Sequence, residues 1–256
     1  MENFSGYRLF SFFYLLYLGL NLSFCQIIVD ESLTAQEVVE TILIGEGIDI
    51  FNITYSGDMD QIGSFNTNNS NILISDGMVL ATGSCSNVIG PNNSGSSTTG
   101  GGYFGVNDPD LDQLSTFSTN DAAVLEFDFI PNGDVVSVNY SFGSEEYNEF
   151  VCGSVNDAFG IFLSGPGING AFINNAINLA VIPGTDGIPV TINTVNNGVV
   201  GSSGMASNCA QVDPEWMNNT EYYIDNATNS EPNATQLDGF TVALVAEAAV
   251  QCGQTY

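Results

Sequence analysis

Basic side chains are nearly absent from this sequence. Its 256 residues hold no histidine and one base, Arg8, against 29 Asp and Glu, which gives a formal net charge of −28 at pH 7. Without histidine, Ser-His-Asp and Cys-His catalytic groups and histidine metal sites are excluded. Without further Lys or Arg the chain cannot neutralise phosphates, so we expect neither nucleic acid nor an anionic membrane surface as a partner.

Charged residues of any kind are scarce, whereas apolar residues are plentiful. Charged residues make up 12% of the chain and hydrophobic residues 44%. This apolar fraction is enough for a packed core, and the length suits one all-β domain or two small ones. The chemistry left to such a chain is carboxylate chemistry, recognition through hydroxyl and amide groups, and cation binding.

The first 25 residues have the features of a secretory signal peptide. Arg8 supplies a weak positive charge, Leu9–Leu20 is an apolar run too short to span a bilayer, and Ser23 and Cys25 are small residues suited to cleavage after residue 25. Two alternatives stay open: a lipoprotein signal with Cys25 lipidated, and a buried N-terminal helix. Loss of the signal peptide removes Arg8 and Glu2, which leaves an exported chain with no basic side chain.

Hydrophobic alternation predicts that strands dominate the rest of the chain. In Ala123–Ile130 and Asp134–Phe142, apolar and polar residues alternate, so each strand has one core face and one wet face, and Pro131–Gly133 joins them as a turn. We expect an all-β fold, an antiparallel β-sandwich of jelly-roll type. Further strands are expected at Ile48–Tyr55, Ile72–Ala81, Phe159–Ser164, Leu179–Ile182, Val190–Val195, Tyr222–Ile224 and Phe240–Val250.

One short helix is expected near the N-terminus, over Ser32–Ile44, where Thr34 and Glu37 have the spacing of a capping box. At the other end, the predicted strand Phe240–Val250 is followed by few residues before Tyr256 and by no partner strand. We therefore expect residues 26–256 to form one domain that lacks its C-terminal part.

Four cysteines follow the signal peptide, and an even count in an exported chain suggests two disulfides. Four cysteines allow three connectivities, of which we prefer Cys152–Cys209 with Cys85–Cys252. The alternative is four buried free thiols.

A group of closely spaced acids is the main candidate site. Four acids fall within a 13-residue window that also holds Asn156: Glu145, Glu146, Glu149 and Asp157. No Lys or Arg is present to pair with them, and close like charges repel by about 1 kcal/mol each even in water. Ca²⁺, which takes six to eight oxygen ligands, would relieve that repulsion. The alternative is a solvated acidic face, and in a regular strand Glu145 and Glu146 would point to opposite sides.

A second metal candidate is the Asp-x-Asp-x-Asp spacing of Asp108, Asp110 and Asp112. An EF-hand is excluded, because Gln113 and Thr119 occupy the positions of its glycine and its last acid. The alternative is an acidic turn that precedes a helical segment.

Trp216 is the single tryptophan and lies in a polar segment. It is a candidate for stacking on a sugar ring, and the alternative is a side chain that covers the edge of the core.

Several motifs together resemble one known family. Phe142–Val151 reads FGSEEYNEFV and Asn156–Gly167 reads NDAFGIFLSGPG, and the set continues with Ala122–Phe129, Asn178–Ala180, Pro183–Thr185, Val190–Asn196 and Asp238–Thr241. Over residues 30–256 the chain resembles the choice-of-anchor L domain of bacterial surface and secreted proteins. The resemblance implies an exported protein whose relatives carry varied C-terminal anchoring signals, and it implies no particular activity.

We therefore expect an exported, non-catalytic binding or adhesion module, stabilised by Ca²⁺, at the cell surface or secreted. Its expected partners are an extracellular glycan or protein and further domains or a sorting region of the same protein, with no membrane span in the mature chain. The alternative function is a secreted carbohydrate-active hydrolase, which needs a carboxylate pair such as Glu146 with Asp157.

Overall fold

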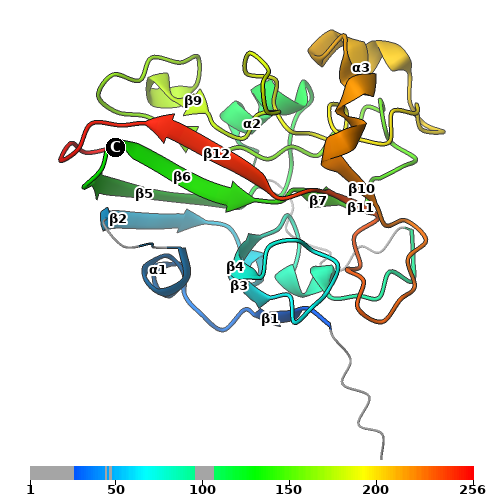
Figure 1. Ribbon diagram of the computed structural model, residues 1–256, viewed down its shortest axis with the longest axis horizontal. Helices are drawn as coiled ribbons and strands as arrows, with labels where there is room; N and C mark the ends of the chain where they lie inside the picture. The colour runs from blue at the N-terminus through cyan, green and yellow to red at the C-terminus, as the bar shows by residue number, and fades with distance from the viewer. Residues whose placement is uncertain (1–25, 44, 46–47, 96–106) are drawn as a thin grey trace, which may run out of the picture.

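A computed structural model describes residues 26–43, 45, 48–95 and 107–256. The predicted signal peptide, residues 1–25, lies outside the described residues. Regular structure in the described part consists mainly of short antiparallel strands in five small sheets, with a few short helices (Figure 1). The predicted all-β, antiparallel class is confirmed.

The two longest strand pairs lie near the centre of the molecule. β2 (Ile48–Ser56) pairs with β5 (Val124–Pro131), and β6 (Val135–Tyr140) pairs with β12 (Leu244–Ala249). Figure 1 shows the two pairs stacked one above the other. Apolar side chains of both pairs pack around a shared cluster, which is consistent with a sandwich: Phe129, Leu163, Val250 and Tyr256, with Ile48, Ile50, Val136 and Ala248 against them.

The turn between β5 and β6 joins strands of two different sheets. The second edge of β5 is already taken, because the backbones of Phe129 and Tyr256 exchange two hydrogen bonds of 2.9 Å. β5 therefore cannot form a ladder with β6 there, although the sequence alternation suggested two neighbouring strands. The two predicted strands themselves are confirmed to within a few residues.

The predicted strand Phe240–Val250 is divided into β11 (Gly239–Thr241) and β12. β11 pairs with β7 (Gly143–Ser144) and with β10 (Tyr223–Asp225). β12 pairs with β6, a partner that the residues next to β12 in the sequence do not indicate. The last residue, Tyr256, is buried, and its hydroxyl donates a 2.9 Å hydrogen bond to the carbonyl of Pro166.

The N-terminal residues form a separate layer below the central strands (Figure 1). β3 (Ile62–Asn66) pairs with both β1 (Ile28–Asp30) and β4 (Asp76–Leu80). The predicted helix is shorter than expected, with α1 at Ala35–Val38 continuing as a π-helical segment, η1, at Val39–Leu43. Its capping box is confirmed: Thr34 accepts from the backbone of Glu37, whose carboxylate accepts from the backbone of Thr34. Two 3₁₀ turns complete this layer, η2 (Met59–Gln61) and η3 (Cys85–Val88).

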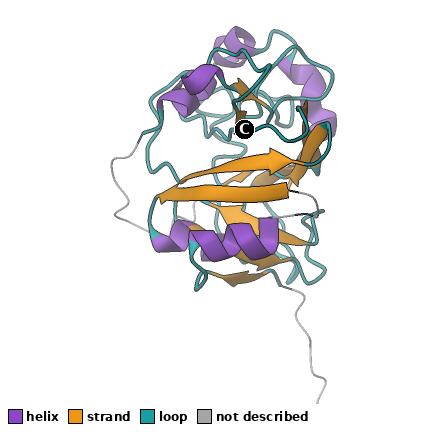
Figure 2. Cartoon of the chain, turned by 90° about the vertical axis from the view of Figure 1, so that its left-hand side faces the viewer, coloured by secondary structure: helices purple, strands orange, loops and turns teal. Residues whose placement is uncertain are grey.

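The opposite side of the molecule is rich in loops and short helices, as Figure 2 shows. It holds the helices α2 (Pro109–Ser115) and α3 (Ala206–Val212), the 3₁₀ segments η4 (Ile173–Asn175) and η5 (Trp216–Tyr222), and the paired strands β8 (Phe162–Leu163) and β9 (Ile177–Asn178). The strands predicted at Phe159–Ser164 and Leu179–Ile182 are reduced to two-residue strands or single bridges.

The strand predicted at Val190–Val195 is wrong. The segment is a series of buried turns whose polar side chains bond to nearby backbone: Asn193 donates to the carbonyl of Gly153 (3.2 Å) and Asn196 to that of Ile192 (2.8 Å). Its β-branched residues favoured a strand, but its fully buried amides and hydroxyls replace ladder hydrogen bonds.

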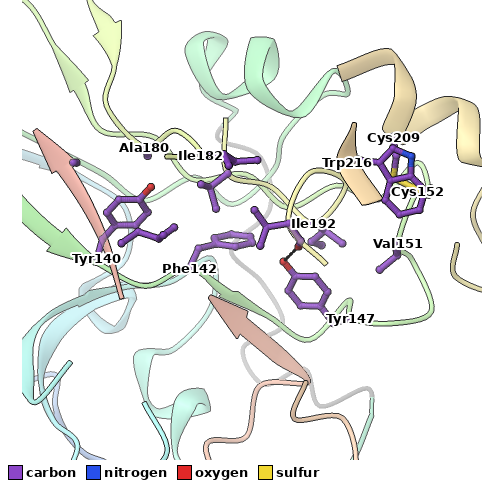
Figure 3. Packing of buried hydrophobic residues seen from close by; sticks show 14 residues of the cluster. Tyr140, Phe142, Tyr147, Val151, Cys152, Ala180, Ile182, Ile192, Cys209 and Trp216 are labelled. Atoms are coloured by element: carbon purple, nitrogen blue, oxygen red, sulfur yellow. Dashed lines mark hydrogen bonds between the residues drawn. A yellow bond between two sulfur atoms is a disulfide. The ribbon is translucent and has the colours of Figure 1, made fainter. Parts of the chain in front are cut away.

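This loop region closes over the main hydrophobic core. Figure 3 shows Phe142, Tyr147, Ile182 and Ile192 converging there, beside Tyr140 of β6. The hydroxyl of Tyr147, which is fully buried, donates to the carbonyl of Val195 at 2.6 Å. The core thus fixes the segment that follows β7, which carries the predicted acids Glu145, Glu146 and Glu149.

One of the two predicted disulfides is present. Cys152 and Cys209 are bonded and fully buried, and Figure 3 shows Trp216 beside them. The second, Cys85–Cys252, is wrong. The Cys85 thiol is buried in the N-terminal layer, where it donates to the carbonyl of Val79 at 3.6 Å, whereas Cys252 is exposed in the turn after β12.

Candidate functional site

Three of the predicted acids lie around the turn that follows β7. Glu145 and Glu146 belong to this turn and not to a strand, so strict alternation of faces does not apply to them. Ser144 links two acidic residues: its hydroxyl donates to Oδ2 of Asp157 at 2.7 Å and accepts from the backbone N–H of Glu146 at 2.9 Å. Glu149, one turn further on, is exposed. The sequence window therefore does fold into a local group of carboxylates.

Burial and mutual repulsion act on this group. The pKa of Glu146 is raised, first by burial and then by the charges of Asp157, Glu149 and Asp238. Burial also raises the pKa of Asp157, which the hydrogen bond from Ser144 partly offsets. Both carboxylates favour a proton or a cation more strongly than an exposed acid does.

Asp238 is the acid that sequence reasoning missed. It directly precedes β11, is fully buried, and its Oδ1 accepts a 2.7 Å hydrogen bond from the side-chain amide of Asn92. Its pKa is raised to about 6, and burial is the main cause. The hydrogen bond from Asn92 opposes this rise, and the charges of Glu149 and Asp225 add to it. It lies about 90 residues from the others in the sequence, and its one sequence signal was its place in the Asp238–Thr241 motif. We call Glu146, Glu149, Asp157 and Asp238 the acidic cluster.

A network of buried amides positions Asp238. Asn92 also donates to the carbonyl of Asn226 at 2.9 Å, and Asn226 donates to the carbonyl of Leu237 at 2.6 Å. Gln236 donates to the carbonyl of Ser94 at 3.1 Å. The segment at 92–94 is thus tied to the chain that leads to Asp238, and Asn92 holds one oxygen of its carboxylate in place.

Asn156 does not take part in the acidic cluster. Its side-chain N–H donates to the carbonyl of Ser115 at 2.9 Å, and its oxygen accepts from the backbone of Asn193 at 3.0 Å. Within the described ranges, no three His, Cys, Asp or Glu side chains are grouped closely enough to hold a metal ion on their own. The acidic cluster is consequently a loose group of carboxylates and not a preformed cage.

The Asp108, Asp110 and Asp112 spacing corresponds to the acidic turn before a helix. Asp108 is the N-cap of α2, and its carboxylate accepts from the backbone of Asp110 and Leu111, both at 2.9 Å. Asp110 accepts from the backbone of Ile173, and Asp112 from the backbone and hydroxyl of Thr119. Each carboxylate closes a different local contact, so the three do not converge on a common ligand position.

The interpretation of Trp216 as a stacking platform is wrong. Its side chain is 3% exposed and lies in the main core beside the Cys152–Cys209 disulfide (Figure 3). Glu215, Asn218 and Thr220 beside it are exposed, while the indole is packed in the core, as the core-edge alternative required.

A shallow cavity is found on the N-terminal layer and not at the acidic cluster. It is lined by Ile28, Ile42 and Phe65 together with polar residues of β1, β3 and β4. Neither Glu146 nor Asp157 lines it, so the carboxylate pair of the hydrolase alternative does not face this cavity.

Comparison with known proteins gives one match. A family model described as the Choice-of-anchor L domain matches residues 27–256. No curated protein and no solved structure matches significantly. Across the part of the chain that the structure describes, no helix is both long and apolar enough to cross a membrane.

Proposed function

The chain belongs to the choice-of-anchor L family, which implies a surface-associated or secreted protein, and from that premise we propose that it is a non-catalytic binding or adhesion module stabilised by Ca²⁺. The observation that carries the calcium part is the acidic cluster, in which burial and repulsion act on carboxylates that have no basic residue to pair with after Arg8. Ca²⁺ is abundant outside cells and prefers such oxygen ligands.

The binding part is supported by apolar side chains on the surface of the loop at 197–205 and of η5. Val199, Met205 and Met217 are 63%, 64% and 58% exposed. The two segments are in contact, because a Cβ added at Gly198 would lie 3.5 Å from the carbonyl oxygen of Met217. Contiguous exposed apolar groups mark interaction sites, and we propose that these three side chains form such a surface. We call this surface the apolar patch.

Acids border the apolar patch. Glu215 and Glu221 are exposed at the start and end of η5, and Glu149 is held against the loop by a 3.0 Å hydrogen bond from the backbone of Ser203 to its carbonyl. A complementary partner would present apolar side chains surrounded by Lys and Arg, because opposite potentials favour association. We therefore propose a protein ligand with a basic rim.

A binding screen tests this proposal. The chain from residue 26, immobilised, would be exposed to arrays of purified extracellular proteins and of glycans at low and high salt. We expect a basic protein to bind, with an affinity that falls as the salt concentration rises. In the double variant Val199→Ser/Met217→Ser the affinity should fall at least tenfold. Leu73→Ser, which alters an equally exposed apolar residue elsewhere, is the control and should change nothing.

Other outcomes of the screen would overturn parts of the proposal. Binding to glycans alone would replace the protein ligand by a carbohydrate. No binding to any probe would leave a structural spacer as the function. Hydrolysis of a glycan that is lost in Glu146→Gln would favour the hydrolase alternative, for which a raised pKa on Glu146 is the one supporting observation.

A further inference from the structure

One buried oxygen of the acidic cluster has no hydrogen-bond partner among the described residues. Asp238 is 0% exposed, and while its Oδ1 accepts from Asn92, no donor in the described ranges bonds to its buried Oδ2. Buried carboxylate oxygens are nearly always paired, because an unpaired one loses its hydration without compensation. No Lys or Arg follows Arg8 in the sequence, so no cationic side chain of the exported chain can pair with Oδ2.

Oδ2 points toward a second carboxylate across a glycine. A Cβ added at Gly95 would lie 3.7 Å from Oδ2 of Asp238 and 3.8 Å from Oε1 of Glu149. The two oxygens thus both lie close to the position that a side chain at residue 95 would take. Glu149 is exposed, so its side chain is free to adjust toward a shared ligand, while Asp238 is held in place by Asn92.

We propose that Oδ2 of Asp238 and the carboxylate of Glu149 hold a Ca²⁺ ion in the space above Gly95. Two carboxylates from the protein, with the remaining positions filled by backbone carbonyls and water, suit a cation that accepts six to eight oxygens at about 2.3–2.6 Å. No histidine exists in the chain, and no cysteine belongs to the acidic cluster, so the ligand set is one for a hard cation.

The proposed site deepens the calcium part of the proposed function and rests on it. Its ligands differ from those expected from the sequence. Asn156 is hydrogen-bonded to the backbone of Asn193, and Asp157 accepts a hydrogen bond from Ser144, so neither belongs to the proposed site. An ion at this position would connect the turn after β7, which carries Glu149, to the start of β11. It would also lie beside the apolar patch, since the backbone of Glu149 is bonded to that loop.

Calcium titration of variants tests the site. The chain from residue 26, freed of metal by chelation, would be titrated with CaCl₂ by calorimetry and melted with and without Ca²⁺. We expect the wild type to bind one ion per chain, and Asp238→Asn and Glu149→Gln to bind it at least tenfold more weakly and to lose most of the rise in melting temperature. Gly95→Ala should weaken binding without removing a charge.

Two controls make the outcomes distinguishable. Glu247→Gln removes an exposed acid on β12 and should bind Ca²⁺ as the wild type does. Asp238→Asn should melt cooperatively in chelator at or above the wild-type temperature, which shows that it is folded. If the wild type does not respond to Ca²⁺, the calcium part of the proposed function fails. If the wild type responds and Asp238→Asn and Glu149→Gln respond equally, calcium stabilisation stands and this site is refuted.

Discussion

Removal of the Cys152–Cys209 disulfide should destabilise the fold more than any other single change to the cysteines. The two cysteines are 57 residues apart in sequence, and closing a loop of that length lowers the entropy of the unfolded chain by about 14 cal/mol/K, or about 4 kcal/mol at 25 °C. For a domain of this size that corresponds to a fall in melting temperature of roughly 8–16 °C. The Cys152→Ala/Cys209→Ala variant tests this in urea unfolding and thermal melting.

The matched control is Cys252→Ala. Cys252 is exposed and free, so its replacement should leave the free energy of unfolding unchanged. Thiol titration of the chain from residue 26 should find one reactive thiol in the native state, two in denaturant and four after reduction. An unchanged stability in the double variant, or a loss of several kcal/mol in Cys252→Ala, would refute the assignment.

Three further predictions concern single residues. In chelator, the free energy of unfolding should fall as pH rises from about 4 to 7, because the raised pKa of Asp238 lets the folded state keep a proton that the unfolded state releases. In Asp238→Asn this pH dependence should be smaller by at most about 3 kcal/mol. A pH dependence identical to that of the wild type would contradict the assignment. Trp216→Ala should cost about 3–5 kcal/mol in urea unfolding, and a loss well below this would mean that the indole is not part of the core. Asp108→Ala should cost about 1 kcal/mol as a lost N-cap and leave the calcium response intact, and a lost response would place a metal at α2.

Local features of the fold were predictable because they depend on neighbouring residues. The capping box of Thr34 and Glu37, the alternation of β5 and β6 and the antiparallel class follow from short-range geometry and side-chain periodicity. The pairing of strands was not predictable in this way. β6 takes its partner from more than 100 residues downstream, and the edge of β5 is covered by Tyr256, so no local pattern marks either contact.

The candidate site was predictable in part for the same reason. Glu146, Glu149 and Asp157 are close in sequence and remain close in space, whereas Asp238 reaches them through the pairing of β11 with β7. The spacing of acids also could not show which oxygens are already occupied. Asn156 is bonded to the backbone on both sides of its amide, a condition that depends on the fold around it.

The central claim is that this acidic chain takes Ca²⁺ from its surroundings as a structural counterion. The most direct test is the melting temperature of the metal-free chain from residue 26 at pH 7, measured as a function of Ca²⁺ concentration. An ion that binds the folded state adds about 2.7 kcal/mol at 100 times its dissociation constant, which is roughly 5–10 °C for a domain of this size. We predict a rise of this order that increases with the logarithm of Ca²⁺ concentration, and a melting temperature that stays constant from chelator to millimolar Ca²⁺ would contradict the claim.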